Sequence, residues 1–157
     1  MTPEADAPLS LHARLEAAMR DSMRARDEQR TTTLRMALAA AHNQRIARGR
    51  ELTDEEVVEV VGREVKQRRE SIEVYRGAGR EERAAAEEAE VAILTEFLPE
   101  QLTDDEITAL ARAAIEESGA FGPADTGKVM GRVAPQTKGR ADGRRVSDIV
   151  RGLLAET

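Results

Sequence analysis

Apolar residues return every three or four positions through most of this chain, which is the spacing of one face of an α-helix. The first such stripe follows Ser10, a good N-cap, and predicts a helix over residues 10–26 through Leu11, Leu15, Met19 and Met23. A second stripe begins after Asp27, another suitable cap. Gly49 is expected to end this second helix near residue 48, because glycine readily adopts the left-handed conformation that closes helices.

Two segments carry the same signal for the start of a helix. Residues 52–57 read LTDEEV and residues 102–107 read LTDDEI. Each places Thr at the N-cap, Glu three positions later, and apolar residues on both sides, which is a capping box with a hydrophobic staple. The first predicts a helix over 54–76, which Gly77 and Gly79 stop. The second predicts a later helix that ends at Gly119.

Helix-breaking residues divide the rest of the chain. A fourth helix is predicted over 80–97, and the segment from Pro99 to Leu102 is the candidate domain boundary, because helix is disfavoured just before proline. A sixth helix is expected over 125–134, stopped by Pro135, and a last one after Asp142. The pattern contains no convincing strand. It predicts an all-α fold with a four-helix N-terminal domain over 9–98 and a small three-helix tail domain over 102–157.

Composition supports helices and removes several kinds of chemistry. Aromatic residues make up 2% of the 157 residues, and 26 are Ala, which suits close-packed helices better than sheets. The absence of Cys excludes disulfides, thiol nucleophiles and thiolate metal sites. No apolar stretch is long enough for a membrane span and no signal peptide is visible at the start. A soluble cytoplasmic protein with no membrane partner is therefore expected.

The sequence contains few residues that are suited to nucleophilic catalysis. The chain has two His, His12 and His42, and five Ser without the glycine-flanked setting of a nucleophile elbow. No His–carboxylate spacing indicates a metal site, and no glycine-rich loop with Lys-Ser/Thr indicates a nucleotide site. Both His are interpreted as surface or partly buried helix residues. The sequence thus predicts no catalytic residue, no metal and no cofactor.

Two charges interrupt apolar stripes on consecutive helices. Arg68 lies on the core-facing side of the helix predicted over 54–76, and Glu90 lies among Ala and Leu positions of the next helix. An unpaired buried charge costs several kcal/mol, so the two helices are expected to form a hairpin in which Arg68 and Glu90 make a structural ion pair. The alternative is that Arg68 extends to the rim of the core.

The tail combines glycines with bases. Residues 127–131 read GKVMG and residues 138–145 read KGRADGRR, within a segment, 119–157, whose formal charge is +3, whereas residues 81–118 carry −10. Glycines permit a close approach to a phosphate while cations neutralise it. The alternative, a tight turn with solvated bases, is favoured by spacing alone. The candidate RNA-binding residues are Lys128, Arg132, Lys138, Arg140, Arg144 and Arg145.

The three aromatic residues are expected mostly at core-facing positions, which argues against a platform that stacks bases. Any contact with RNA would then read the backbone and the shape of the RNA. The overall charge of −6 also argues against a general polyanion binder and leaves room for a localised basic patch.

Several motifs together resemble the GatB/YqeY family, which comprises YqeY-like proteins and the C-terminal part of GatB, the tRNA-recognising subunit of the tRNA-dependent amidotransferase. The resemblance extends from about Leu9 to Leu154. The tail blocks 127–131 and 138–143 carry most of it. The other matching segments are Leu34–Met36, Lys66–Ser71, Tyr75, Ala78–Arg80, Glu87, Glu90, Phe97–Pro99 and Gln101–Leu102.

This resemblance implies an all-α, two-part fold and contact with tRNA, a partner used in translation. Three hypotheses follow. The first is a stand-alone tRNA-binding module whose tail bases contact phosphates. The second is an interaction module that docks on an amidotransferase or an aminoacyl-tRNA synthetase. The third is a carbon–nitrogen ligase with glutamine as amide donor, which the family label implies, although no residue of this chain resembles the catalytic parts of that enzyme.

Overall fold

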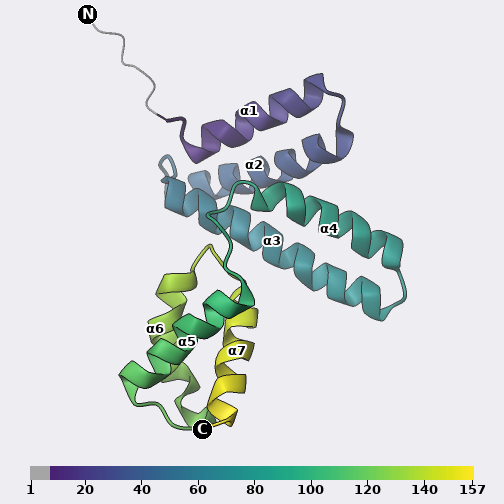
Figure 1. Cartoon of the computed structure of the whole chain (residues 1–157). Helices are drawn as coiled ribbons and strands as arrows, with labels where there is room; N and C mark the ends of the chain where they lie inside the picture. Colours follow the sequence, from purple (N-terminus) through teal and green to yellow (C-terminus); the bar gives the residue numbers. More distant parts are fainter. Residues whose placement is uncertain (1–7) are drawn as a thin grey trace, which may run out of the picture. The chain divides into compact units, whose positions relative to one another are not determined.

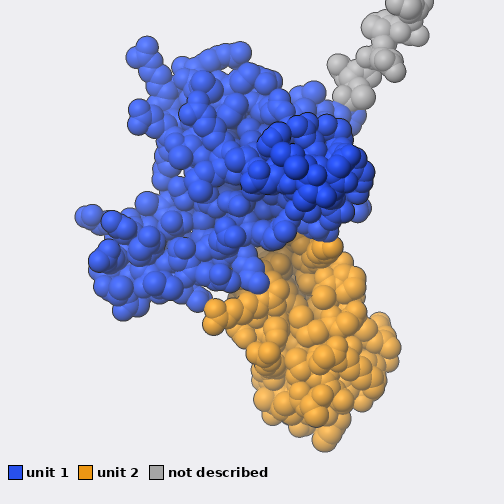
Figure 2. Space-filling model, turned by 180° about the vertical axis from the view of Figure 1, so that it is seen from behind, with its two compact units in different colours: residues 1–98 blue, residues 99–157 orange. Residues whose placement is uncertain are grey.

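The computed structural model describes residues 8–157 and is entirely helical over that range, so the predicted all-α class is confirmed. Seven α-helices and one 3-10 helix follow one another along the described chain (Figure 1). The chain divides into two compact units, Met1–Leu98 and Pro99–Thr157 (Figure 2). Each unit is described by itself below.

The first unit contains four helices, which are α1 (Leu11–Arg24), α2 (Glu28–Arg48), α3 (Asp54–Gly77) and α4 (Glu81–Thr95). Helices α3 and α4 form a hairpin, and the two helices lie side by side along their length (Figure 1). Leu15, Leu34, Val61 and Leu94, one from each helix, are fully buried in a shared core. Met23, expected on the first apolar stripe, is half exposed at the end of α1 and lies outside this core.

The second unit contains α5 (Asp104–Ser118), the 3-10 helix η1 (Pro123–Asp125), α6 (Thr126–Thr137) and α7 (Gly143–Ala155). All three α-helices contact one another. Their apolar stripes meet in a core of small aliphatic side chains with no aromatic member, which is composed of Leu102, Ile107, Ala111, Ala114, Ala120, Val129, Val133, Val146, Val150 and Leu154.

The predicted helix caps are present. Both capping boxes form, with Thr53 paired to Glu56 and Thr103 paired to Glu106 in reciprocal hydrogen bonds. Each box satisfies two backbone donors that the start of a helix leaves without partners. Gly49, which closes α2, has a φ of +70°, a conformation that residues with a side chain rarely adopt.

The expected end of the sixth helix is wrong. The sequence predicted a stop at Ala134, but α6 continues through Pro135 to Thr137. Pro135 has no N–H to donate to the Gly131 carbonyl, so the helix loses one backbone hydrogen bond there. The last turn still closes, since the Lys138 amide donates to the Ala134 carbonyl at 3.0 Å. Burial of Thr137, whose hydroxyl donates to the Val133 carbonyl, also holds this turn in place.

Candidate functional site

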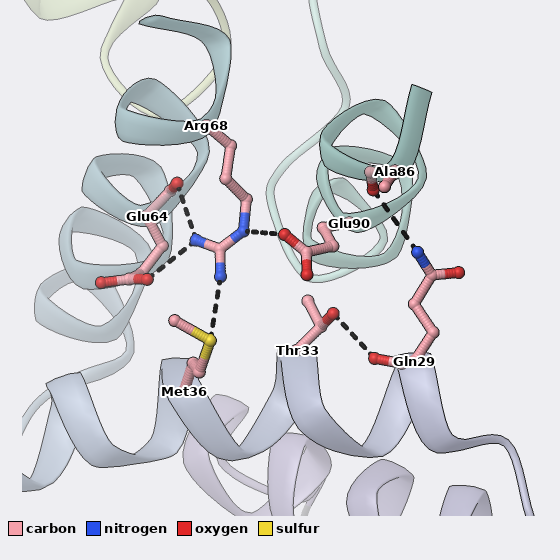
Figure 3. A network of polar contacts seen from close by, with 7 residues as sticks. All are labelled: Gln29, Thr33, Met36, Glu64, Arg68, Ala86 and Glu90. Atoms are coloured by element: carbon pink, nitrogen blue, oxygen red, sulfur yellow. Dashed lines mark hydrogen bonds and ion pairs between the residues drawn. The ribbon is translucent and has the colours of Figure 1, made fainter. Parts of the chain in front are cut away.

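Arg68 lies at the centre of a polar network between α2, α3 and α4 (Figure 3). Only 5% of this residue is exposed. Its Nε donates to Oε2 of Glu90 at 3.1 Å, and the Glu90 side chain is 23% exposed. The structure therefore brings together the two charges that interrupt the apolar stripes, with the cation buried and the anion at the edge of the core.

The network has two further partners that the sequence analysis missed. Nη1 of Arg68 donates to both the backbone carbonyl and the carboxylate of Glu64, at 3.0 and 2.9 Å, and Nη2 contacts the Met36 sulfur at 3.6 Å (Figure 3). Glu64 precedes Arg68 by one helical turn, a spacing that favours such pairs. This i,i+4 spacing was the signal available in the sequence, whereas the Met36 contact depends on how α2 packs.

Glu87 lies close to this network on the preceding turn of α4. Its pKa is raised above the ordinary value, first because burial disfavours the charged form and second because the Glu90 carboxylate repels it. Two carboxylates already hydrogen-bond the single guanidinium of Arg68, so a third negative charge nearby is poorly compensated. The network is therefore well satisfied at Arg68 and unfavourable at Glu87.

This network stabilises the packing of α2, α3 and α4 against one another. Gln29 on α2 adds a bond to the Ala86 carbonyl of α4, at 3.4 Å, and its own carbonyl accepts from Thr33 at 2.8 Å (Figure 3). No group of three or more His, Cys, Asp or Glu within residues 8–157 is arranged to hold a metal ion. These contacts fix the α3–α4 hairpin against α2.

The tail bases lie along α6 and its connection to α7. Lys128 and Arg132 are one turn apart on α6, and Lys138 follows the end of that helix. At 1.5 Å per residue, Lys128 lies about 14 Å back from Thr137 along the helix. Lys138, Arg140, Arg144 and Arg145 lie in the connection to α7 and in its first turn. All are exposed except Arg140, which is partly buried.

Acidic side chains of α5 engage two of these bases. Arg145 pairs with Asp104, which lowers the pKa of that carboxyl through a direct hydrogen bond from the guanidinium. Arg132 lies 3.7 Å from Glu117, with both side chains about half exposed or more. Exposed pairs of this kind contribute little to stability and exchange readily. The second unit as a whole carries eight basic and ten acidic side chains, so its formal charge is −2.

The loop after α6 has a structural role that the sequence analysis missed. The carbonyls of Gly139 and Arg140 accept from the Gln101 side chain at 3.0 Å and the Leu102 amide at 2.8 Å. Nε of Arg140 in turn donates to the Glu100 carbonyl at 3.2 Å. Part of the glycine–base motif therefore ties down the segment that leads into α5. The main signal for this contact in the sequence was that residues 101–102 and residues 138–143 both belong to the segments that carry the family resemblance.

Two glycines of α6 have no evident role inside the chain. Gly127 and Gly131 are both exposed and lie one turn apart on the same side of the helix. A Cβ added at either position would meet no atom within 4 Å, so packing does not require glycine there. Glycine inside a helix costs roughly 0.5–1 kcal/mol relative to alanine. Gly62 on α3 and Gly152 on α7 also have open space around them, and what distinguishes Gly127 and Gly131 is that two such glycines lie one turn apart on one side of a helix.

Phe121 is the exception among the aromatic residues, which were expected mostly at core-facing positions. This residue lies in the connection between α5 and η1 and is 76% exposed, whereas Phe97 is buried in the first unit. The preceding Ala120 is buried and Gly122 turns the chain with a φ of +77°, so the backbone carries Phe121 outward. One exposed ring is still not a stacking platform.

None of the helices in the described part of the chain is long and apolar enough to cross a membrane.

Comparison with known proteins yields a family and two curated relatives. The family model described as Yqey-like protein matches residues 12–154. "Altered inheritance of mitochondria protein 41, mitochondrial", of Pyrenophora tritici-repentis, is 31% identical over 130 residues, which cover 82% of this chain and 71% of the relative. "Uncharacterized protein C22F3.15", of Schizosaccharomyces pombe, is 30% identical over 95 residues, which cover 60% of this chain and 77% of the relative.

Proposed function

The chain belongs to the YqeY-like protein family, and on this premise we propose that it is a tRNA-binding module whose tail contacts the RNA backbone. The resemblance of the tail to the tRNA-recognising part of GatB supplies the class of RNA. The name of the Pyrenophora relative assigns that protein to mitochondria, so a cytoplasmic location of this chain stays a prediction.

A single observation carries this proposal. Gly127 and Gly131 leave an open strip on α6, and Lys128 and Arg132 follow them directly in sequence. A phosphate backbone can approach a helix closely where side chains are absent, and neighbouring cations neutralise it. The fold itself gains nothing from these two glycines. Their placement beside exposed bases is explained if a polyanion lies along the strip.

The electrostatics limit how tight this binding can be. Arg132 and Arg145 have acidic partners on α5, and the second unit has a formal charge of −2. A polyanion must therefore compete with local carboxylates. We expect modest affinity for the chain alone, on the order of micromolar, and little preference among tRNAs, because phosphates carry no sequence information directly.

The test compares two double variants in a tRNA-binding assay with full-length chain. Lys138→Ala with Arg140→Ala removes two charges from the tail, and Arg14→Ala with Arg24→Ala removes two exposed charges from α1 as a matched control. We expect the first variant to weaken binding to several tRNAs by a similar factor and the second to leave it nearly unchanged. Equal losses would show diffuse electrostatics and contradict the proposed site.

A protein-docking role is the second candidate, and exposed apolar side chains favour it. Val74 on α3 and Phe121 before η1 are each at least 70% exposed. The partner expected for this role is an amidotransferase or an aminoacyl-tRNA synthetase. Binding to such a partner that survives high salt, together with failure to bind tRNA at low salt, would favour this role over the first. Ligase activity with glutamine is the third candidate, and release of ammonia from glutamine by the purified chain would support it.

We also propose that the two units fold as separate domains with a cleavable connection at Pro99–Leu102. Each has its own apolar core. Limited proteolysis should first cut there or in the exposed turns near Gly79 and Gly122. Uniform protection at all three places would contradict separate domains.

A further inference from the structure

Two methionines of the first unit are half exposed, and the proposed RNA contact uses neither of them. Met36 on α2 is 49% exposed, and Met23 at the end of α1 is 48% exposed. Met19 and Met130, by contrast, are partly buried and pack against the apolar cores of their units. Among the methionines of residues 8–157, Met23 and Met36 are therefore the two that an oxidant in solution reaches most readily.

Each of these two sulfurs faces an arginine, but the two arginines differ in burial. Nη2 of Arg68 donates to the Met36 sulfur at 3.6 Å. Nη2 of Arg35 donates to the Met23 sulfur at 3.7 Å. Arg68 is 5% exposed, whereas Arg35 is in contact with water. The chain therefore contains a matched pair of methionines that differ mainly in the surroundings of the neighbouring guanidinium.

The acceptors around Arg68 differ in strength. Its Nε donates to the Glu90 carboxylate, and its Nη1 donates to the carbonyl and the carboxylate of Glu64. Its Nη2 donates to a thioether sulfur, which is a weak acceptor (Figure 3). A buried charged donor gains most from a strong acceptor, because water does not compete for it. A better acceptor at the position of the Met36 sulfur would therefore strengthen the contact between α2 and α3.

Oxidation supplies such an acceptor. Hydrogen peroxide transfers one oxygen atom to a thioether: the O–O bond breaks, an S–O bond forms, the sulfur is oxidised by two electrons, and the departing hydroxide takes the proton of the transferred oxygen and becomes water. An N–H···O hydrogen bond spans about 2.9 Å, so an oxygen on the Met36 sulfur reaches Nη2 after a small movement of this flexible side chain. We propose that Met36 is a reversible oxidation site whose sulfoxide oxygen accepts from the buried guanidinium of Arg68.

The consequence for stability is opposite to the usual effect of methionine oxidation. A sulfoxide is polar and disrupts a core in which it is buried. Met36 is half exposed, so its oxidation sacrifices little apolar packing. At Met23 the sulfoxide meets the exposed guanidinium of Arg35, for which water competes. Oxidation therefore stabilises the packing of α2 against α3 at Met36 and leaves stability nearly unchanged at Met23.

Hydrogen peroxide treatment of two full-length variants separates the two sites. Met23→Leu leaves Met36 as the half-exposed methionine, Met36→Leu leaves Met23, and mass spectrometry of peptides shows which sulfur has gained oxygen. In urea unfolding, oxidation of the first variant should raise the folding equilibrium constant by about threefold to tenfold, because an oxygen replaces a weak acceptor of a charged donor. Oxidation of the second should leave unfolding nearly unchanged. Methionine sulfoxide reductases should reverse the gain.

Glutamine reproduces the sulfoxide without an oxidant, because its amide carbon and oxygen take the places of the sulfur and its oxygen. Met36→Gln should increase stability and Met23→Gln should not. Combined with Arg68→Leu and Glu90→Leu, which remove the guanidinium and its partner, Met36→Gln should give no such gain. Failure of peroxide to oxidise Met36 where it oxidises Met23, an equal change in stability at the two methionines, or a gain that persists without Arg68 would overturn the proposal.

Discussion

Arginine occupies two different environments in the two units of this protein. In the first unit, Arg68 is almost fully buried and is held by two carboxylates. In the second, Arg132 and Arg145 remain largely exposed beside acids of α5. The first arrangement is costly to break, because a charge without its partner stays out of water. The second can exchange its partners for a phosphate at little cost.

The glycines also fall into two kinds. Gly49 and Gly119 have positive φ values and close helices, so the fold explains them. Gly127 and Gly131 lie in ordinary helix with open space around them. Gly152 on α7 is also in open space, so the comparison teaches that a glycine without a packing role becomes informative only when a second one lies a turn away, as at Gly127 and Gly131. Each prediction below tests this separation.

The largest effect is expected for Arg68→Ala. The change leaves Glu64 and Glu90 facing each other without their cation, and we expect a loss of about 3 kcal/mol in the free energy of unfolding. Urea unfolding of the full chain measures it. The double variant Arg68→Leu with Glu90→Leu should cost less than Arg68→Ala alone, because it removes both charges. Equal losses would contradict a buried ion pair, and tRNA binding by the folded variants should not change.

A smaller loss is expected for Arg140→Ala. This change removes the hydrogen bond to the Glu100 carbonyl and should destabilise the second unit by about 1 kcal/mol. Lys138→Ala, at an exposed position of the same loop, should change stability by less than about 0.5 kcal/mol. Thermal unfolding of both variants gives the comparison. The anchoring role of Arg140 would be contradicted if both variants unfolded like the unchanged chain.

Gly131→Ala should increase stability and weaken tRNA binding. A Cβ meets nothing at this position, so alanine should add roughly 0.5–1 kcal/mol through better helix propensity. The same Cβ should obstruct an approaching phosphate backbone. Gly152→Ala, in open space on α7, is the matched control and should stabilise without any effect on binding. Unchanged tRNA affinity in Gly131→Ala would remove the observation on which the proposed function rests.

The smallest effect is expected for Glu87→Gln. Burial and Glu90 raise the pKa of Glu87, so its ionised form disfavours the folded state at neutral pH. Gln should therefore stabilise the chain by a few tenths of a kcal/mol at pH 7. Below the ordinary value of 4.5 the carboxyl is neutral in both states, and the advantage of Gln should disappear. A gain that persists unchanged at acidic pH would contradict this electrostatic origin.

Much of the fold could be predicted from the sequence, because caps and stripes depend on neighbours within one or two turns. The pairs Thr53–Glu56 and Thr103–Glu106 are local, and the structure contains both capping boxes. The end of α6 was missed because burial of Thr137, a tertiary effect, outweighs the lost bond at Pro135.

The candidate site was only partly accessible to sequence reasoning. The bases of the tail are visible as a motif, but the acids that face them come from α5, more than twelve residues away. The contact between Arg140 and Glu100 joins segments forty residues apart in the chain. Helical periodicity indicates which side of a helix faces inward, and it contains no information on which helix supplies the partner.

The central claim is that the tail bases contact tRNA phosphates, and the salt dependence of binding by the full chain tests it most directly. With three or four phosphates neutralised, the logarithm of the association constant should fall with the logarithm of salt concentration at a slope of roughly −3 to −4. Lys138→Ala with Arg140→Ala should flatten that slope by about one to two units. Binding that does not depend on salt, or no binding at low salt, would contradict the account.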